Sequence, residues 1–302
     1  MLSIIDRQMP KRTAMIVVLI SSSVWGLLWL PLRFMEHQGL TGRWANGFFV
    51  LMPLPLLLWA YARPVLRDRA NWGVYFWAGG VIGFGFMFYT LGLIIGSVTK
   101  TTLLFYLTPV WSSLLGMIFL GEKPKLALWV GNALGLTGCA LILELSPSSL
   151  EIEAVDLLGL LSGIFWAIGA VIVRRYPEAH YTGITLVQYI SSLMIAAGGV
   201  MIMGLEVPPV SAFVDSLPVA AGVSIFIILP ALLFIFRTTQ YISPAVVGIL
   251  MLSEVFAAVI SASILLDEHI LPLQWLGAGL IILTAVIVTL SESAGSHSSS
   301  GD

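Results

Sequence analysis

Ten long runs of apolar residues, each close to the length that crosses a lipid bilayer as an α-helix, constrain this chain more than any other feature of its sequence. A hydrocarbon core about 30 Å thick requires roughly 20 residues of helix. Inside that core only helices and closed barrels satisfy the backbone polar groups, and the short alternating runs of barrel strands are missing from the sequence. The predicted spans cover residues 13–32, 44–62, 72–95, 98–120, 126–145, 157–173, 184–205, 217–236, 242–266 and 273–290.

The composition agrees with a chain that lies mostly in lipid. Of its 302 residues, 58% are hydrophobic and only 10% are charged, and the mean hydropathy is +0.99. A water-soluble domain of this size needs more polar surface, and a net charge of -2 supplies no basic surface for nucleic acid. The first run is too long and too rich in tryptophan for a cleaved signal peptide. We therefore expect an all-α polytopic membrane protein with the lipid bilayer as its environment.

Few residues offer metal or covalent chemistry. Cys139 is the single cysteine of the sequence, which excludes an internal disulfide and a cysteine cluster for metal. The four histidines are scattered over connections and the tail without metal-ligand spacing, and no nucleophile motif is present. We expect no metal, no cofactor and no catalytic residue, so an integral-membrane enzyme stays as an alternative without a supporting motif.

The basic residues sort between alternate connections. With a cytoplasmic N-terminus, the outer connections keep Arg33, Arg43 and Lys100, and the inner side holds 11 of the 14 Lys and Arg residues. This bias predicts that both termini are cytoplasmic, in a membrane of the bacterial inner-membrane type. The inner cations are Arg7, Lys11, Arg12, Arg63, Arg67, Arg69, Lys123, Lys125, Arg174, Arg175 and Arg237.

The two halves of the sequence resemble each other. Because a unit of five spans is odd, the second copy enters the membrane from the opposite side, which predicts inverted repeats around a central, alternately accessible site. A duplication that merely built a stable bundle is the alternative. A shift of 146 residues pairs Ser97 with Ser243, Glu122 with Glu268, Trp129 with Trp275 and Gly131 with Gly277, and a shift of 141 pairs Trp25 with Trp166, Arg33 with Arg174 and Thr41 with Thr182.

We place the first repeat at residues 1–145 and the second at 155–291, followed by a tail at 292–302. The tail is rich in serine and glycine, and we expect it to be disordered.

Two copies of a motif carry a family resemblance. The first copy reads LFYLTPVW at 104–111, LGEKP at 120–124 and WVG at 129–131, and the second reads SEVF at 253–256, LDE at 266–268 and WLG at 275–277. This pattern resembles the EamA family of the drug/metabolite transporter superfamily. The resemblance implies a ten-helix carrier with both termini inside, usually an exporter of amino acids or related metabolites. It also implies a cavity lined by helices one, three, four, six, eight and nine.

The second copy departs from the first at one place, with Glu254 and Val255 where the first has Thr108 and Pro109. We therefore transfer no substrate from aromatic amino acid exporters of this fold. The expected function is secondary active transport of a small metabolite, such as an amino acid, another zwitterion or an amine, with proton coupling or exchange and with no required protein partner. A channel or facilitator without ion coupling is the alternative.

Glu254 is the most informative single position for transport. It lies 12 residues from each end of the predicted span 242–266, near the bilayer midplane. A carboxylate there is expensive unless it faces water, a partner or a proton. It could couple protons, act as counter-charge for a cationic substrate group, or be a structural hydrogen-bonded carboxyl that ties helices together.

Lys100 is the second unusual charge. It could snorkel to the outer surface, or it could bind a substrate carboxylate or pair with Glu254 in the cavity. Aromatic rings could hold an ammonium group, although core packing or an interfacial belt is the alternative for each ring. Trp25 and Trp29 are four residues apart and are expected to share one helix face. The aromatic candidates for substrate binding are Trp25, Trp29, Tyr89, Tyr106 and Trp166.

Two prolines are predicted hinges, and two carboxylates are predicted loop or gate residues. Pro109 and Pro244 lie in paired helices, where a proline removes a backbone bond and bends the axis, so we expect hinges there. Glu122 and Glu268 lie at opposite membrane faces as loop or gate carboxylates.

Overall fold

The computed structural model describes residues 9–40, 42–144, 153–203, 206–266 and 269–297, and these residues form helices and connecting turns without a strand. Arg7, Thr41, Glu151 and Glu268 lie outside the described residues, as does the segment 298–302. The helices of the first half are α2 (Lys11–Trp25), α3 (Trp29–His37), α4 (Gly42–Leu51), α5 (Leu54–Arg67), α6 (Trp72–Val74), α7 (Gly80–Ile95), α8 (Val98–Phe105), α9 (Thr108–Leu115) and α10 (Leu126–Ile142).

The second half repeats this order of long and broken helices. A π-helical turn joins α6 to α7 at Tyr75–Gly79, and another joins α13 to α14 at Ser224–Ile228. The helices of the second half are α11 (Leu157–Arg175), α12 (Tyr181–Met203), α13 (Val210–Val223), α14 (Leu229–Thr239), α15 (Pro244–Met251), α16 (Ser253–Leu266) and α17 (Pro272–His297). Because α17 runs to His297, it includes residues 292–297 of the segment assigned to the tail.

The prediction of an all-helical polytopic membrane protein is confirmed. Within the described residues, eight helical stretches are long and apolar enough to span a membrane, and the bent pair α4–α5, with a 43° bend, makes up to nine. The helix α10 is apolar but has only 17 residues. Within the described residues, each of the ten predicted segments overlaps an apolar helix, and eight or nine stretches are long enough to span a membrane.

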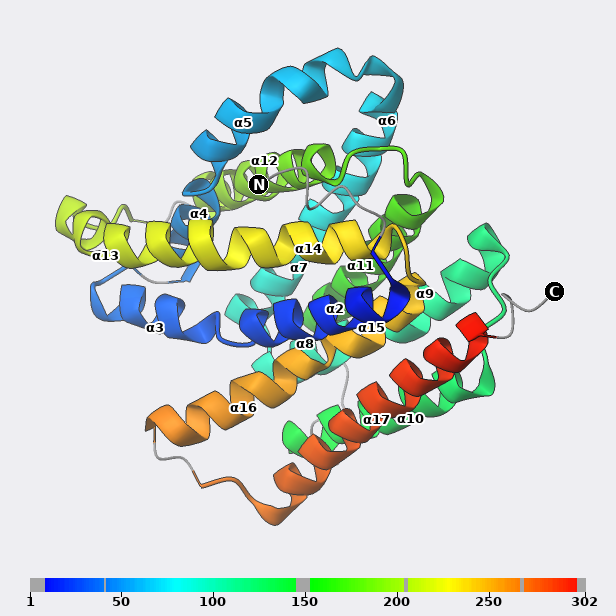
Figure 1. The fold of residues 1–302 in the computed structure, drawn as a ribbon. Coiled ribbons are helices and arrows are strands. Elements are labelled where there is room, and N and C mark those ends of the chain that lie inside the picture. The colour runs from blue at the N-terminus through cyan, green and yellow to red at the C-terminus, as the bar shows by residue number, and fades with distance from the viewer. Residues whose placement is uncertain (1–8, 41, 145–152, 204–205, 267–268, 298–302) are drawn as a thin grey trace.

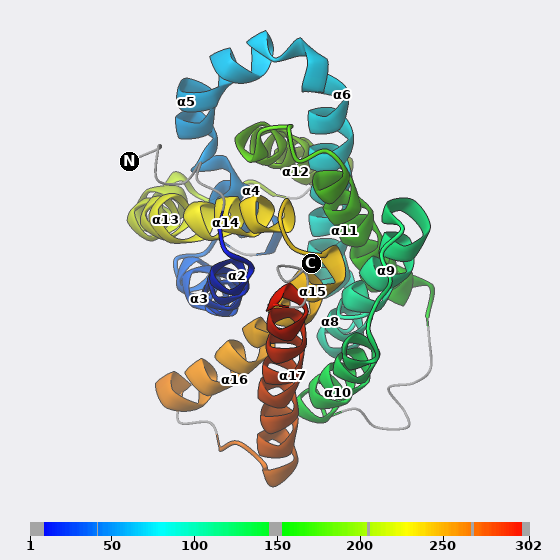
Figure 2. The same ribbon diagram turned by 45° about the vertical axis from the view of Figure 1, so that its right-hand side comes forward.

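The helices of one half pack against those of the other in a repeated pattern. The helix α2 packs against α14, α15 and α16, and its counterpart α11 packs against α7, α8 and α9. The helices α10 and α17 lie side by side over most of their length, at one edge of the bundle (Figures 1 and 2). The first span of each repeat thus contacts the third and fourth spans of the other repeat.

Glycines allow the closest of these approaches. A Cβ atom on Gly138 of α10 would lie 2.7 Å from the carbonyl oxygen of Gly277, and one on Gly277 of α17 would lie 2.5 Å from the carbonyl oxygen of Gly138. The two backbones therefore meet where neither residue has a side chain, as in other close crossings of membrane helices.

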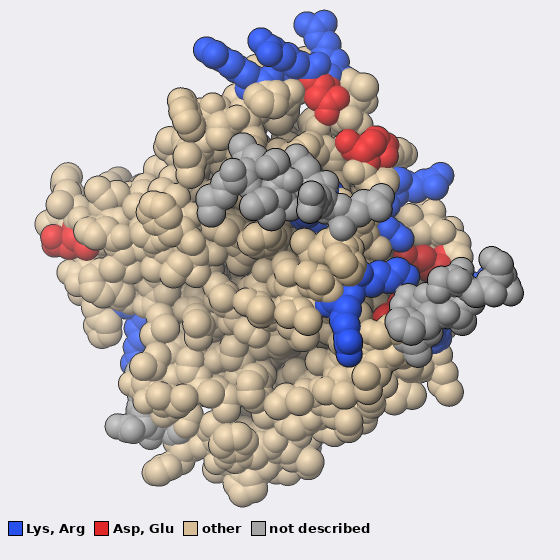
Figure 3. All heavy atoms as spheres, viewed as in Figure 1, with Lys and Arg blue, Asp and Glu red and all other residues tan. Residues whose placement is uncertain are grey.

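Charged residues concentrate toward one side of the molecule. On the face in Figure 3, Lys and Arg gather at the top, over α5, and toward the right-hand edge, while most of the remaining surface is uncharged. Lys11, at the start of α2, and Glu292, near the end of α17, line one cavity. The start of α2 and the end of α17 therefore lie at the same side of the bundle.

Candidate functional site

Two helices are interrupted at equivalent positions of the two repeats. The helix α8 ends at Phe105 and α9 begins at Thr108, and α15 ends at Met251 and α16 begins at Ser253. The shift of 146 residues that relates the halves carries Tyr106 onto Leu252, so the two breaks coincide. Interrupted helices at corresponding places in inverted repeats typically mark the binding site of a transporter.

A buried hydrogen bond joins the two breaks. The phenol oxygen of Tyr106 donates to Oε1 of Glu254 at 2.5 Å, and the two residues are only 5% and 7% exposed. Glu254 lies in the first turn of α16, where the positive end of the helix dipole stabilises a carboxylate. The carboxylate thus has a phenol donor from one repeat and a helix N-terminus from the other.

Aromatic rings surround this carboxylate. We call the enclosed space the central chamber, and its volume of ≈ 20 Å³ is about enough for one water molecule. The rings of Trp25 and Phe86 meet edge-on with centroids 6.1 Å apart, and those of Tyr89 and Phe105 lie 4.7 Å apart. A metabolite therefore needs a wider arrangement of the surrounding helices. The chamber is lined by Trp25, Phe86, Tyr89, Phe105, Trp166, Ile235, Met251 and Glu254.

Five of the seven predicted binding residues come together here. Trp25, Tyr89, Trp166 and Glu254 line the central chamber, and Tyr106 contacts Glu254. These five come from α2, α7, α11, α16 and the break after α8, so they converge from both halves.

Trp29 lines a different cavity from the one that Trp25 lines. The helix α2 ends at Trp25, and the turn at residues 26–28 is tightened by hydrogen bonds such as Leu28 N to Trp25 O at 3.0 Å. The indole nitrogen of Trp29 donates to Ser261 Oγ at 3.1 Å, beside a second cavity.

Lys100 also lies outside the residues that line the central chamber. Its Nζ is 3.3 Å from Oδ2 of Asp156, whose side chain is almost fully buried. The same oxygen accepts a hydrogen bond from the backbone nitrogen of Glu153 at 2.8 Å, in a capping box just before α11. In this conformation Lys100 pairs with Asp156 rather than with Glu254. A buried pair of this kind ties α8 to the start of α11.

The two predicted hinge prolines occupy different local positions. Pro109 is the second residue of α9, directly after the break at 106–107, and Gly248 of α15 packs against it. Pro244 is the first residue of α15. A proline at that position is tolerated without bending a helix, so the expected interior kink is missing at Pro244.

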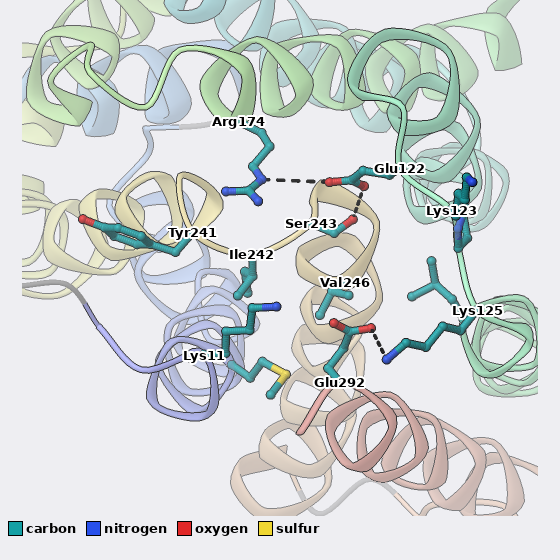
Figure 4. Close-up of a pocket in the computed structure, with 13 residues that line it drawn as sticks. Lys11, Glu122, Lys123, Lys125, Arg174, Tyr241, Ile242, Ser243, Val246 and Glu292 are labelled. Carbon is teal, nitrogen blue, oxygen red and sulfur yellow. Dashed lines mark hydrogen bonds and ion pairs between the residues drawn. The ribbon is translucent and has the colours of Figure 1, made fainter. Parts of the chain in front are cut away.

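A charged cavity of ≈ 450 Å³, which we call the Glu122 pocket, lies at one end of the bundle (Figure 4). Oε2 of Glu122 accepts a hydrogen bond from Ser243 Oγ at 2.5 Å, and Oε1 lies 3.9 Å from Nε of Arg174. Nearby, Lys125 Nζ and Glu292 Oε1 are 3.7 Å apart. Each contact joins a helix or turn of the first half to one of the second half, so together they link the two halves at this end of the molecule.

These links are weak enough to break during a transport cycle. Both partners of the Glu122–Arg174 pair are partly exposed, and exposed pairs contribute only about 0–1 kcal/mol. We expect Glu122→Gln to speed maleimide labelling of a cysteine at Val246, which lines the same pocket, by up to about fivefold in a Cys139→Ser background. The exposed Glu178 supplies the control, Glu178→Gln. Equal labelling rates in all three proteins would contradict this role of Glu122.

Sequence reasoning missed several of these residues. Ser243 and Arg174 were visible as members of repeat-related pairs, but nothing in the sequence showed that they meet Glu122. Asp156 was visible only as an acid in a connection. The apolar chamber residues Phe86 and Phe105 have no signal that separates them from other core residues. Among the described residues, no group of three or more His, Cys, Asp or Glu side chains is placed to hold a metal.

Comparison with known proteins agrees with this architecture. The model of the EamA-like transporter family matches twice, at residues 12–144 and 154–290. The chain belongs to the EamA-like transporter family. As a member, it is a multi-pass membrane protein and a transporter of the drug/metabolite type, built from two repeats.

Solved structures agree with this family at the level of the fold. Twenty-seven chains of solved structures match this protein. One crystal structure of a protein superimposes with a TM-score of 0.73 at 16% sequence identity, covering 92% of this chain and 98% of that chain. At this identity the likeness shows the fold alone. A search of the curated proteins found no match.

Proposed function

We propose that this EamA-like transporter is a secondary active carrier that exports an amino acid or a small amine by alternating access. The buried contact between Tyr106 and Glu254, across the breaks of the two repeats, is the observation that carries this proposal. An ionised Glu254 binds the ammonium group of the substrate, with Trp25 and Trp166 against its apolar part. Protonation of Glu254 releases the cation, which couples transport to protons.

Cavities at both ends of the bundle support alternating access. The Glu122 pocket is formed by the ends of α2, α15 and α17 that lie nearest Lys11, Ser243 and Glu292. A second cavity, of ≈ 660 Å³, is lined by Trp29, His269 and Gln274, from the opposite ends of the same three spans. Along the first span, Met15 lines the Glu122 pocket, Trp25 lines the central chamber and Trp29 lines the second cavity, so the chamber lies between the other two. The chamber is contracted, as expected for a carrier between its two open states.

The placement in the membrane is part of the same proposal. We place ten spans in a membrane of the bacterial inner-membrane type, with repeats at 1–145 and 155–291. The shared cavity of Lys11 and Glu292 supports an even number of crossings. The basic residues around the Glu122 pocket support a cytoplasmic location for that end, and the direction of export rests on the family resemblance.

Transport by the purified protein in proteoliposomes tests this proposal. A thermal-shift screen of amino acids, polyamines and quaternary amines first selects the substrate. We then expect saturable uptake of the radiolabelled compound, and counterflow when the vesicles are preloaded with the unlabelled compound. Linear flux without counterflow would identify a channel or facilitator and overturn the proposal.

A further inference from the structure

Arg43 carries a buried positive charge that has no acidic or hydrogen-bonding partner in the described part of the chain. It lies in the first turn of α4 and is only 8% exposed. Among the described residues, Nε, Nη1 and Nη2 of Arg43 have no hydrogen-bond partner, and no acidic side chain forms an ion pair with it. An isolated guanidinium in an apolar setting is strongly unfavourable, which indicates a ligand that completes the site.

Arg43 lines a cavity of ≈ 490 Å³ between α4, α12 and the start of α13. This volume is in the range of small-molecule sites. The rest of the wall is almost entirely apolar and includes Phe48, Ala196, Ala197 and Phe213. The cavity is distinct from the central chamber, because the two share no lining residue.

The cavity opens on the apolar surface that faces lipid. Met201 and Val207, both on its rim, are 81% and 73% exposed. The indole of Trp44 donates to the backbone oxygen of Glu206 at 3.0 Å beside Arg43, where α4 begins. Tryptophans concentrate at the depth of lipid headgroups, so Arg43 lies near the level of the phosphates and the apolar walls extend toward the acyl chains.

The local electrostatics favour an anion. The free N–H groups and positive dipole at the start of α4 attract negative charge, and Arg43 adds a full positive charge in the same turn. A guanidinium matches a phosphate with two parallel hydrogen bonds. A free phosphate would satisfy Arg43 but would leave the apolar walls unfilled, whereas a phospholipid supplies both parts.

We propose that a membrane phospholipid occupies this cavity, with its phosphate on the Arg43 guanidinium and an acyl chain between α4, α12 and α13. This lipid is a bound component of the outer half of the transporter and is separate from the transported substrate. Its removal would leave the charge of Arg43 without a partner in the described structure.

Native mass spectrometry of the detergent-purified protein titrated with phosphatidylglycerol tests the proposal. The matched control is Arg33, an exposed arginine of the neighbouring helix α3. We expect Arg43→Gln to weaken binding of one lipid at least tenfold, and Arg33→Gln to leave it unchanged. Equal lipid affinity in the wild type and Arg43→Gln would overturn the proposal. Displacement of the lipid by inorganic phosphate at an equal concentration would also overturn it, since it would identify a small-anion site.

A second variant leaves Arg43 in place and fills the apolar slot. Ala197 is an exposed lining residue of α12, so Ala197→Trp adds bulk from the lipid side without altering the helix core. We expect it to weaken phosphatidylglycerol binding at least tenfold while thermal unfolding stays cooperative. Undiminished lipid binding by this variant would overturn the proposal even if Arg43→Gln failed to fold.

Discussion

Glu254→Gln is expected to reduce transport of an ammonium-bearing substrate by about ten- to a hundredfold and to remove its dependence on pH. The amide keeps the shape of the side chain and can still accept from Tyr106, but it carries no charge and binds no proton in the physiological range. The loss corresponds to a hydrogen bond to a charged group, about 1.5–3 kcal/mol. Initial rates in proteoliposomes between pH 5 and pH 8 measure both effects.

Two further variants separate the role of Glu254 from a general effect of lost charge. Glu178→Gln removes an exposed carboxylate from the turn between α11 and α12 and should leave the rate and the pH profile unchanged. Tyr106→Phe keeps the Glu254 carboxylate but removes its donor, so it should shift the pH profile without flattening it. If Glu254→Gln retained the pH-dependent flux of the wild type, Glu254 would not be the coupling group.

Gly26→Ala is expected to destabilise the folded protein by about 1–3 kcal/mol, the usual penalty for overpacking. Gly26 directly follows the last residue of α2, and a Cβ atom there would overlap the backbone carbonyl of Glu254 on α16. Because the obstacle is backbone, no side-chain rotation relieves it, and α2 must move away from the central chamber. A lower midpoint of thermal unfolding in detergent and reduced transport measure this change.

Gly279→Ala is the matched control for that substitution. Gly279 lies on the exposed side of α17, with no atom within 4 Å of the position that a Cβ would take. Alanine is favoured over glycine in a helix interior by up to about 1 kcal/mol, so this variant should be at least as stable as the wild type. Equal changes in the two variants would show that α2 does not depend on a close approach at Gly26.

The sequence predicted the features that depend on the bilayer and on the repeat. Glu254 was predictable because a carboxylate in the middle of an apolar span is costly and stands out. Trp25 and Trp166 were predictable because the shift of 141 residues that relates the two halves of the sequence pairs them. These signals are local or periodic, so no knowledge of packing was needed.

Other features depend on contacts between distant segments. The ion pair of Lys100 with Asp156 crosses from one repeat to the other, and either residue alone is equally compatible with a snorkelling side chain. The place of Trp29 depends on its hydrogen bond to Ser261 on α16, a contact between segments far apart in the sequence. The break at Tyr106 and Leu107 contains no glycine or proline, although Pro109 follows it, so local propensity did not locate it.

Alternating access around the central chamber is most directly tested by locking one end of the bundle. In a Cys139→Ser background, the double variant Glu122→Cys/Ser243→Cys places two thiols where the repeats meet at the Glu122 pocket. A short, reducible thiol cross-linker should stop substrate counterflow in proteoliposomes, and a reductant should restore it. Counterflow at the rate of the unlinked protein, with cross-linking complete, would contradict the account.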